Sequence, residues 1–417
     1  MKNKVTLESI LKAKRALNGL VVRTPTEKNS ELSESHGYNV YLKREDQQKV
    51  RSYKIRGAVN FVKSIDEEQR QKGIVCASAG NHAQGIAYVC NKLDIDGTIF
   101  MPRPTPMQKR RQTERFGKDN VNIMLEGDDF DESCIAAKKY CKEHGKTFVH
   151  PFDDARVISG QGTIGVEILE DLNDVHYILV PVGGGGLISG IGAYVKSISP
   201  GTKIIGVEPE GAASMKKALD NGGPCCLDDC DFDIFVDGVA VKQIGELPYS
   251  IAKEVVDDMI VVPEGKVCTT IMSLYNNEGI VAEPAGALSI AALDYLPDDA
   301  RGKNVVCILS GSNNDIARMQ EIQERSLIYE GLKHYFIVNM PQRPGALMEF
   351  LQEVLGPDDD IAHFEYTKKQ NKEKGPVLIG IELRNKGDYE PLLERMQEKK
   401  IEYKEVLTDE LLRDLLI

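Results

Sequence analysis

The chain has 417 residues, of which 41% are hydrophobic and 28% charged, and its formal net charge is −12. These values are typical of a globular protein long enough for two or three domains. The acidic balance argues against nucleic acid as a partner. We expect no secretory leader, because residues 1–6 lead straight into polar helical sequence without an apolar stretch. We also expect no membrane span, because no run approaches ~20 apolar residues.

The nine cysteines are scattered through the chain without a CxxC motif. This pattern favours a reducing compartment over a disulfide framework. Cys225, Cys226 and Cys230 cluster, but no histidine lies near them at a spacing typical of zinc sites. The sequence therefore predicts a cytoplasmic protein with no bound metal.

Hydrophobic patterning predicts a first helix after Thr6, a short strand over residues 40–43, and then a regular alternation of strands and helices. Alternation of this kind indicates βαβ units and a parallel sheet. The predicted strands are 74–77, 98–101, 121–125, 148–149, 177–180, 204–208 and 305–309. The predicted helices are 54–66, 81–93, 105–116, 129–144, 160–173 and one that ends before Asn221.

Lys54 is the first candidate catalytic residue. It lies between Tyr53 and Ile55, just before a helix start of small residues at Gly57. An amine held there is partly desolvated, which favours its neutral, nucleophilic form and suits Schiff-base chemistry. Taken alone, an ordinary surface lysine is the commoner explanation. Three later segments of the chain change that balance.

The first of these segments is a glycine run that follows the apolar residues 177–182, a predicted buried strand. It comprises Gly183, Gly184, Gly185 and Gly186, and Leu187 then begins a helix. Glycines let several backbone N–H groups surround an anion, and a helix N-terminus adds positive potential, so the loop is a predicted phosphate site. A dinucleotide site is the alternative, because Glu208 ends a strand near the ~20-residue offset of that motif. The GxGxxG spacing is absent, however.

The other two segments also follow predicted strands. Residues 78–85 come after strand 74–77, at the end of the sheet where open α/β folds bind ligands. Gly80 and Asn81 open a helix there and would direct N–H groups at a carboxylate, although Asn81 could also be a plain helix cap. Ser310 ends strand 305–309 and could equally be a capping residue.

In order, spacing and residue type, these segments resemble the fold-type II pyridoxal-phosphate enzymes, most closely the threonine deaminases (threonine ammonia-lyases). The resemblance runs from about Thr24 to the C-terminus. It implies pyridoxal 5'-phosphate on Lys54, with Asn81 at the phenolic oxygen and Ser310 facing the pyridine nitrogen. The implied phosphate loop is Gly183, Gly184, Gly185, Gly186 and Leu187. The implied loop for the substrate carboxylate is Ser78, Ala79, Gly80, Asn81 and His82.

The resemblance also implies a reaction, the α,β-elimination of L-threonine to 2-oxobutanoate and ammonia at the start of isoleucine synthesis. Lys54 would take the α-proton. A hydroxyl at Ser310 stabilises a pyridinium less than a carboxylate does, which favours elimination. Serine racemases carry a second serine where this chain has Ala79, so racemase activity is disfavoured. We expect structural roles for His82 and Glu283.

Two other functions stay open on the sequence. One is a dehydratase of serine or of hydroxyamino acids in general, since serine differs from threonine by one methyl group. The other is a non-catalytic amino-acid-binding regulator, which the intact Lys54 and glycine loop disfavour.

Residues 333–417 follow a strand–helix–strand–strand–helix–strand order, which is ferredoxin-like. The predicted strands are 334–340, 361–366, 377–383 and 401–406. Pro344 suits the first turn of the first helix, whose apolar face would be Leu347, Phe350, Leu351 and Leu355. Residues 340–347 resemble the start of the ACT-like regulatory domain of biosynthetic threonine deaminases, which implies isoleucine, or valine, as effector. An oligomerisation domain without ligand is the alternative.

The predicted fold class is therefore α/β, with two open α/β domains of the fold-type II (tryptophan synthase β-like) kind and a C-terminal ferredoxin-like α+β domain. We expect a catalytic region over 1–320, with a smaller subdomain at about 45–150 inserted in the larger one. A linker would follow over 321–332, and the ACT-like domain would occupy 333–417. The family resemblance implies a homotetramer.

Overall fold

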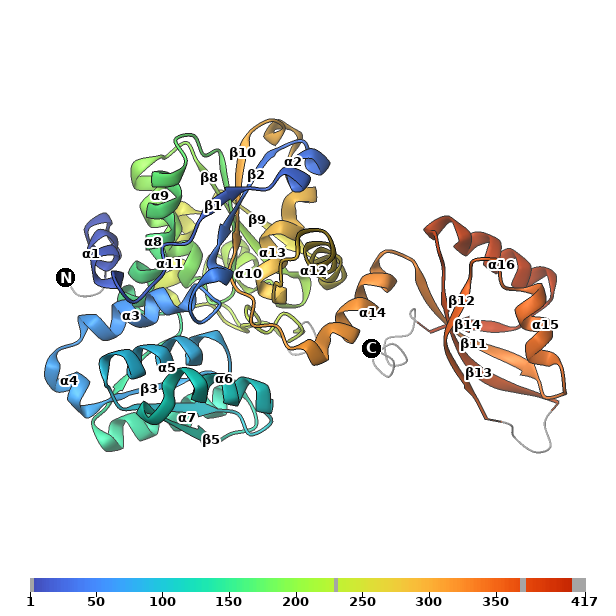
Figure 1. Ribbon diagram of the computed structural model, residues 1–417, viewed down its shortest axis with the longest axis horizontal. Coiled ribbons are helices and arrows are strands. Elements are labelled where there is room, and N and C mark those ends of the chain that lie inside the picture. The colour runs from blue at the N-terminus through green and yellow to red at the C-terminus, as the bar shows by residue number, and fades with distance from the viewer. Residues whose placement is uncertain (1–3, 229–231, 368–372, 407–417) are drawn as a thin grey trace. The chain divides into compact units, whose positions relative to one another are not determined.

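The computed structural model describes residues 4–228, 232–367 and 373–406 (Figure 1). Its chain divides into two compact units, Met1–Asp315 and Ile316–Ile417. Among the residues described, no helix combines the length and the apolar character needed to cross a membrane.

The larger sheet of the first unit has six strands in the order β1-β2-β10-β7-β8-β9. Strand β1 is antiparallel to β2, and every other pairing in this sheet is parallel. All of β7 is buried, as the continuous apolar run predicted. The strands are β1 (Thr26–Lys28), β2 (Asn39–Arg44), β7 (Tyr177–Pro181), β8 (Lys203–Pro209), β9 (Asp258–Val262) and β10 (Asn304–Leu309).

The smaller sheet has four parallel strands in the order β5-β4-β3-β6. They are β3 (Ile74–Ala77), β4 (Gly97–Met101), β5 (Val121–Leu125) and β6 (Thr147–Phe148). In the chain they lie between β2 and β7 of the larger sheet. Figure 1 shows this sheet with α5, α6 and α7 as a lobe of its own. The predicted parallel α/β class is confirmed.

Helix α3 packs against both α5 and α8, and so joins the two lobes. The helices of the first unit are α1 (Leu7–Leu17), α2 (Ser30–His36), α3 (Lys54–Ser64), α4 (Glu67–Lys72), α5 (Asn81–Leu93), α6 (Met107–Gly117), α7 (Phe130–His144), α8 (Ala155–Asp171), α9 (Gly186–Ile198), α10 (Ser214–Asn221), α11 (Glu246–Val255), α12 (Glu264–Glu278) and α13 (Pro284–Ala291).

One predicted helix begins earlier than its pattern suggested. Helix α8 starts at Ala155, not at residue 160, because the side chain of Asp154 accepts a hydrogen bond from the backbone N–H of Arg156 and caps it. The helix predicted over residues 54–66 is α3, which ends at Ser64, and the short helix α4 that follows it was not predicted. Asp66 caps α4 through a capping box with Gln69.

The second unit begins with α14 (Met319–Tyr329) and has one antiparallel sheet in the order β12-β13-β11-β14. Its strands are β11 (Lys333–Pro341), β12 (Asp360–Tyr366), β13 (Lys374–Glu382) and β14 (Tyr403–Glu405), and its helices are α15 (Ala346–Glu353) and α16 (Tyr389–Glu398). Both helices lie on one side of the sheet (Figure 1), over a core that includes Phe336, Ile379 and Leu392. The predicted ferredoxin-like order is confirmed.

The first helix of this unit differs from its prediction. Helix α15 begins at Ala346, after Gly345 with φ +86°, so Pro344 precedes the helix. The buried positions are Ala346, Phe350 and Val354, spaced four residues apart, whereas Leu347 and Leu351 are 38% and 41% exposed. The prediction that these two leucines belong to the buried face was wrong. Side chains four residues apart lie on one side of a helix, and here that buried side does not include the two leucines.

Candidate active site

Lys54 is the first residue of α3, and the segment before it pairs with the loop after β10. Tyr53 N–H donates to the carbonyl oxygen of Ser310 at 3.1 Å, and Ser312 N–H donates to that of Arg51 at 2.9 Å. Ser52 and Gly311 form an antiparallel bridge between these bonds. Arg51 takes a left-handed conformation with φ +58°, which is uncommon outside glycine and turns the chain into this pairing. The predicted Lys54 and Ser310 segments therefore lie side by side.

The positive charge of Lys54 acts on two imidazoles, one of them His82 near the start of α5. The pKa of His82 is lowered to about 3, mainly by burial and in smaller part by the positive charge of Lys54. The pKa of His150 is lowered to about 4, mainly by burial and in smaller part by Lys54. Both imidazoles are therefore neutral at pH 7. The Nε2 of His82 lies 3.2 Å from the carbonyl oxygen of Val149, which fits the structural role that we expected for it.

The glycine loop is packed too tightly for any side chain. A Cβ on Gly184 would lie 2.3 Å from the ring of Phe152, and one on Gly183 would lie 2.8 Å from the backbone of Val239. Gly185 has φ +86° and leads into α9, whose first N–H groups have no partner within the helix. The loop thus offers backbone donors and a helix N-terminus, and the residues present fit a phosphate group.

Ser310 is buried at the end of β10, beside the strand that carries the glycine loop. Its hydroxyl donates to the carbonyl oxygen of Ala285 at 3.1 Å. A neutral ring nitrogen can only accept a hydrogen bond, so the Ser310 hydroxyl would have to turn its hydrogen from the carbonyl oxygen of Ala285 to that nitrogen. This position fits the ring-facing role that the family resemblance implies for it.

Asn81 has two polar partners that the sequence did not reveal. Its Nδ2 donates to Oε1 of Glu283 at 2.6 Å, and its Oδ1 accepts from Nδ2 of Asn313 at 2.7 Å. Burial raises the pKa of Glu283 to about 7. The one signal in the sequence was a single carboxylate in the otherwise apolar stretch around Ala282 and Ala285.

The rest of the predicted carboxylate loop forms the turn before α5. Gly80 N–H lies 3.2 Å from Oγ of Ser78, to which it donates, and Ala79 is half-buried between them. The turn places the first N–H groups of α5 next to Asn81, as an anion site requires. The binding roles of these residues stay predictions.

The dinucleotide alternative does not fit the structure. Glu208 is fully buried, and its two carboxylate oxygens accept the backbone N–H groups of Met215 and Lys216 at 2.7 and 2.9 Å. It therefore caps α10 and cannot reach a ribose. Cys230 of the cysteine cluster lies outside the described residues. Within the described part of the chain, no three potential ligands come together to hold a metal.

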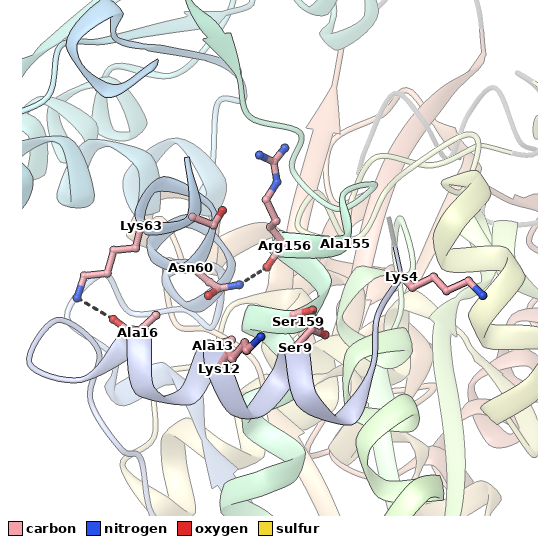
Figure 2. Close-up of a pocket in the computed structure, with 11 residues that line it drawn as sticks. Lys4, Ser9, Lys12, Ala13, Ala16, Asn60, Lys63, Ala155, Arg156 and Ser159 are labelled. Carbon is pink, nitrogen blue, oxygen red and sulfur yellow. Dashed lines mark hydrogen bonds between the residues drawn. The ribbon is translucent and has the colours of Figure 1, made fainter. Parts of the chain in front are cut away.

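A surface hollow of about 300 Å³ lies elsewhere, between α1, α3 and α8 (Figure 2). It contains none of the predicted site residues, although Lys4, Lys63 and Arg156 line it. Figure 2 shows that the charged ends of these three side chains point in different directions. Lys63 donates to the carbonyl oxygen of Ala16 at 2.8 Å, and Arg156 pairs with Asp154. The hollow therefore does not form a convergent anion site.

His150 should make the stability of the protein depend on pH. Its Nδ1 accepts the backbone N–H groups of Phe152 and Asp153, which hold Phe152 behind the glycine loop. Because the folded pKa of about 4 lies below the unfolded value of 6.5, the unfolded chain binds more protons between these values. Stability is therefore complete above pH 6.5 and is lost as the pH falls towards 4.

The measurement is urea unfolding of the wild type and of His150→Gln at pH 7 and pH 5. We expect the wild type to lose about 2 kcal/mol more than the variant between these two values. An equal loss in both proteins would show that His150 is not buried in its neutral form.

Comparisons with known proteins show the family of this chain. Residues 17–311 match the family of pyridoxal-phosphate dependent enzymes, and residues 324–416 match the C-terminal regulatory domain of threonine dehydratase. The biosynthetic L-threonine dehydratase IlvA of Halalkalibacterium halodurans is 56% identical over 415 residues, which cover 99% of this chain and 100% of the relative. The enzyme of the same name from Bacillus subtilis is 56% identical over 414 residues, or 99% of this chain and 98% of the relative.

A solved structure of threonine deaminase isoform 2 from Solanum lycopersicum superposes with a TM-score of 0.72 at 38% identity, covering 78% of this chain and 96% of that one. The fold, the glycine cradle and the lysine define a pyridoxal-phosphate dependent α/β enzyme of fold-type II. Within that class, the chain belongs to the family of biosynthetic threonine dehydratases.

Proposed function

We propose that this enzyme converts L-threonine to 2-oxobutanoate and ammonia, as the first step of isoleucine synthesis. The observation that carries the proposal is that hydrogen bonds join the segments of Lys54, Asn81 and Ser310, beside the strand that leads to the glycine cradle. The chain also matches, over 99% of its length, relatives whose names state this activity. We further propose that the enzyme is a cytoplasmic homotetramer. Sedimentation of the purified enzyme would measure the mass of the oligomer.

Bound pyridoxal phosphate would withdraw electrons from the α-carbon of the substrate. The residues that would hold it are Lys54 at the aldehyde, Asn81 at the phenolic oxygen, Ser310 at the ring nitrogen, and the glycine loop with Leu187 at the phosphate. With the substrate bound, the amine of Lys54 would take the α-proton. The N–H groups at the start of α5 hold the carboxylate of the substrate meanwhile.

The test is a steady-state assay of keto-acid release, with L-threonine and L-serine as competing substrates. We expect 2-oxobutanoate from threonine and a kcat/KM for serine that is lower by about 10-fold or more, since one methyl group in a pocket is worth roughly 1–3 kcal/mol. A kcat/KM for serine equal to or above that for threonine would favour the general hydroxyamino-acid dehydratase. An absence of keto acid from both would favour the non-catalytic regulator.

We propose that isoleucine, or valine, regulates the enzyme through the second unit. The match of residues 324–416 to a regulatory domain supports this, as does the separate hydrophobic core of that unit. A chain that ends at Asp315 keeps every residue assigned to the chemistry. It should still release ammonia from threonine, but without a response to isoleucine.

Coupling between two such sites is typically about 5–150-fold in affinity, so the full-length enzyme should show a clear shift of its threonine saturation curve. Alanine serves as the control amino acid, and soluble, cofactor-loaded protein of both lengths is compared. Inhibition by isoleucine in the short chain would place the effector site in the first unit. A full-length enzyme that ignores both isoleucine and valine would favour an oligomerisation domain.

A further inference from the structure

We propose that Glu283 is a positioning residue, which fixes the side-chain amide of Asn81 so that one N–H of Asn81 is directed to the phenolic oxygen of the cofactor. The inference rests on the proposed function, because it takes Asn81 to be the residue at that oxygen. It assigns a role to a carboxylate that the sequence left as structural.

While Glu283 is ionised, the hydrogen bonds around Asn81 allow its amide only one orientation. Glu283 Oε1 accepts from Asn81 Nδ2 at 2.6 Å, and above its pKa of about 7 the ionised carboxylate can only accept. Asn313 Nδ2 donates to Asn81 Oδ1 at 2.7 Å. Rotating the amide by half a turn would set its oxygen against the carboxylate and its nitrogen against a donor. Since Nδ2 has two hydrogens and Glu283 takes one, the second is left for another acceptor.

Glu283 is itself held by the loop that follows Ser310. Its Oε2 accepts the backbone N–H of Asn313 at 3.2 Å, and its own N–H donates to the carbonyl oxygen of Gly311, also at 3.2 Å. A Cβ on Gly311 would lie 2.2 Å from Oε1, so the loop leaves room for the carboxylate only because glycine stands there. Asn313 Nδ2 also donates to the carbonyl oxygen of Val50, in the segment that leads to Lys54. Glu283 thus links the start of α5 to both sides of the cofactor site.

A merely structural role does not explain the carboxylate. Glu283 is the N-cap of α13, yet its side chain makes no capping hydrogen bond. Burying a carboxylate costs free energy unless its oxygens are hydrogen-bonded. Here one oxygen accepts from the side chain of Asn81 and the other from the backbone N–H of Asn313. The charged groups that face it are Asp237, which favours its protonated form, and Lys109, which opposes that effect. These two residues pair with each other.

The state of the bound cofactor reports the orientation of Asn81. A lysine-bound pyridoxal absorbs in the visible when its phenolic oxygen is anionic, and in the near ultraviolet when that oxygen carries the proton. A donor N–H at the oxygen stabilises the anionic form. Loss of this one hydrogen bond should move the ratio of the two bands about tenfold towards the near ultraviolet.

The experiment compares absorption spectra of resting holoenzyme, without substrate, for Glu283→Gln, Asn81→Ala and the double variant. A glutamine has one acceptor where Glu283 uses two, so its NH2 group would meet either Asn81 or Asn313 as donor against donor. We expect about the same tenfold change in each single variant and no further change in the double one, because both act at one hydrogen bond. Glu264→Gln is the control, a half-buried carboxylate that accepts the N–H of Gly211 elsewhere in the unit. It should match the wild type.

A wild-type band ratio in Glu283→Gln, or an effect that adds in full to that of Asn81→Ala, would overturn the proposal. If Glu283→Gln is insoluble, Asn313→Ala provides the second variant, since it removes the donor to Asn81 Oδ1 and should shift the bands in the same direction. A wild-type protein without any visible band would instead contradict the proposed function itself.

Discussion

Replacing Lys54 by alanine should abolish turnover and remove the visible absorbance of the bound cofactor, while the fold survives. One residue carries both the covalent attachment and the proton transfer, and general acid–base catalysis alone is worth roughly 10²–10⁴-fold. The truncation leaves the backbone pairing of Tyr53 with Ser310 intact, because that bond involves no atom of the Lys54 side chain. The α3 helix should therefore form as before.

The measurements are the rate of 2-oxobutanoate release, the visible spectrum, and circular dichroism as a check of folding. Lys72→Ala is a matched control, since Lys72 is an exposed helical lysine whose partner Glu68 is also exposed. It should keep both the rate and the spectrum of the wild type. A folded Lys54→Ala protein that turns over threonine at a comparable rate would contradict the central assignment.

The local elements of this fold could be predicted from the sequence. Strands β3 and β5 and helix α5 have the bounds that the pattern indicated, because an apolar run or an apolar period ends at a local signal. The glycine loop after β7 could also be predicted from the sequence, since four glycines in a row indicate a closely packed turn of the backbone. The grouping of Lys54 with Ser310 followed from family resemblance, and the backbone bond between Tyr53 and Ser310 agrees with it.

The partners of Asn81 could not be predicted in this way. Glu283 and Asn313 lie 202 and 232 positions away in the chain, and a contact between single side chains leaves no period in the sequence. The start of α8 could not be predicted either, because its capping by Asp154 depends on one side-chain oxygen. Hydrophobic patterning reports which face is buried, whereas polar contacts depend on how the finished elements meet.

Arg56 connects the geometry of the active site to the stability of the fold. It follows Lys54 by two positions on α3 and is 1% exposed. Its guanidinium donates to both carboxylate oxygens of Glu45, at 2.7 and 2.8 Å, and to both of Glu167, also at 2.7 and 2.8 Å. Lys43 donates to Glu167 as well, at 2.7 Å. Two cations thus balance two buried carboxylates, and the network fastens the start of α3 to β2 and α8.

Arg56→Met should lower the free energy of unfolding by about 3–5 kcal/mol, because it leaves two buried carboxylates with a single cation. Burial by itself raises the pKa of Glu167, and Arg56 is the first of the charges that outweigh this effect. Without Arg56, one carboxyl group must either take up a proton or stay buried and unpaired. Urea unfolding at pH 7 measures the loss, with Lys72→Met as the control for an exposed pair worth roughly 0–1 kcal/mol.

The same variant should also hold its cofactor less tightly, since the network fixes the helix turn that carries Lys54. Dialysis of the holoenzyme against buffer, followed at the visible band, would measure how fast the cofactor is lost. A variant within about 1 kcal/mol of the wild type would mean that the carboxylates regain solvent or protons at little cost. A destabilised variant that retains its cofactor as the wild type does would show that the network supports the fold without placing Lys54.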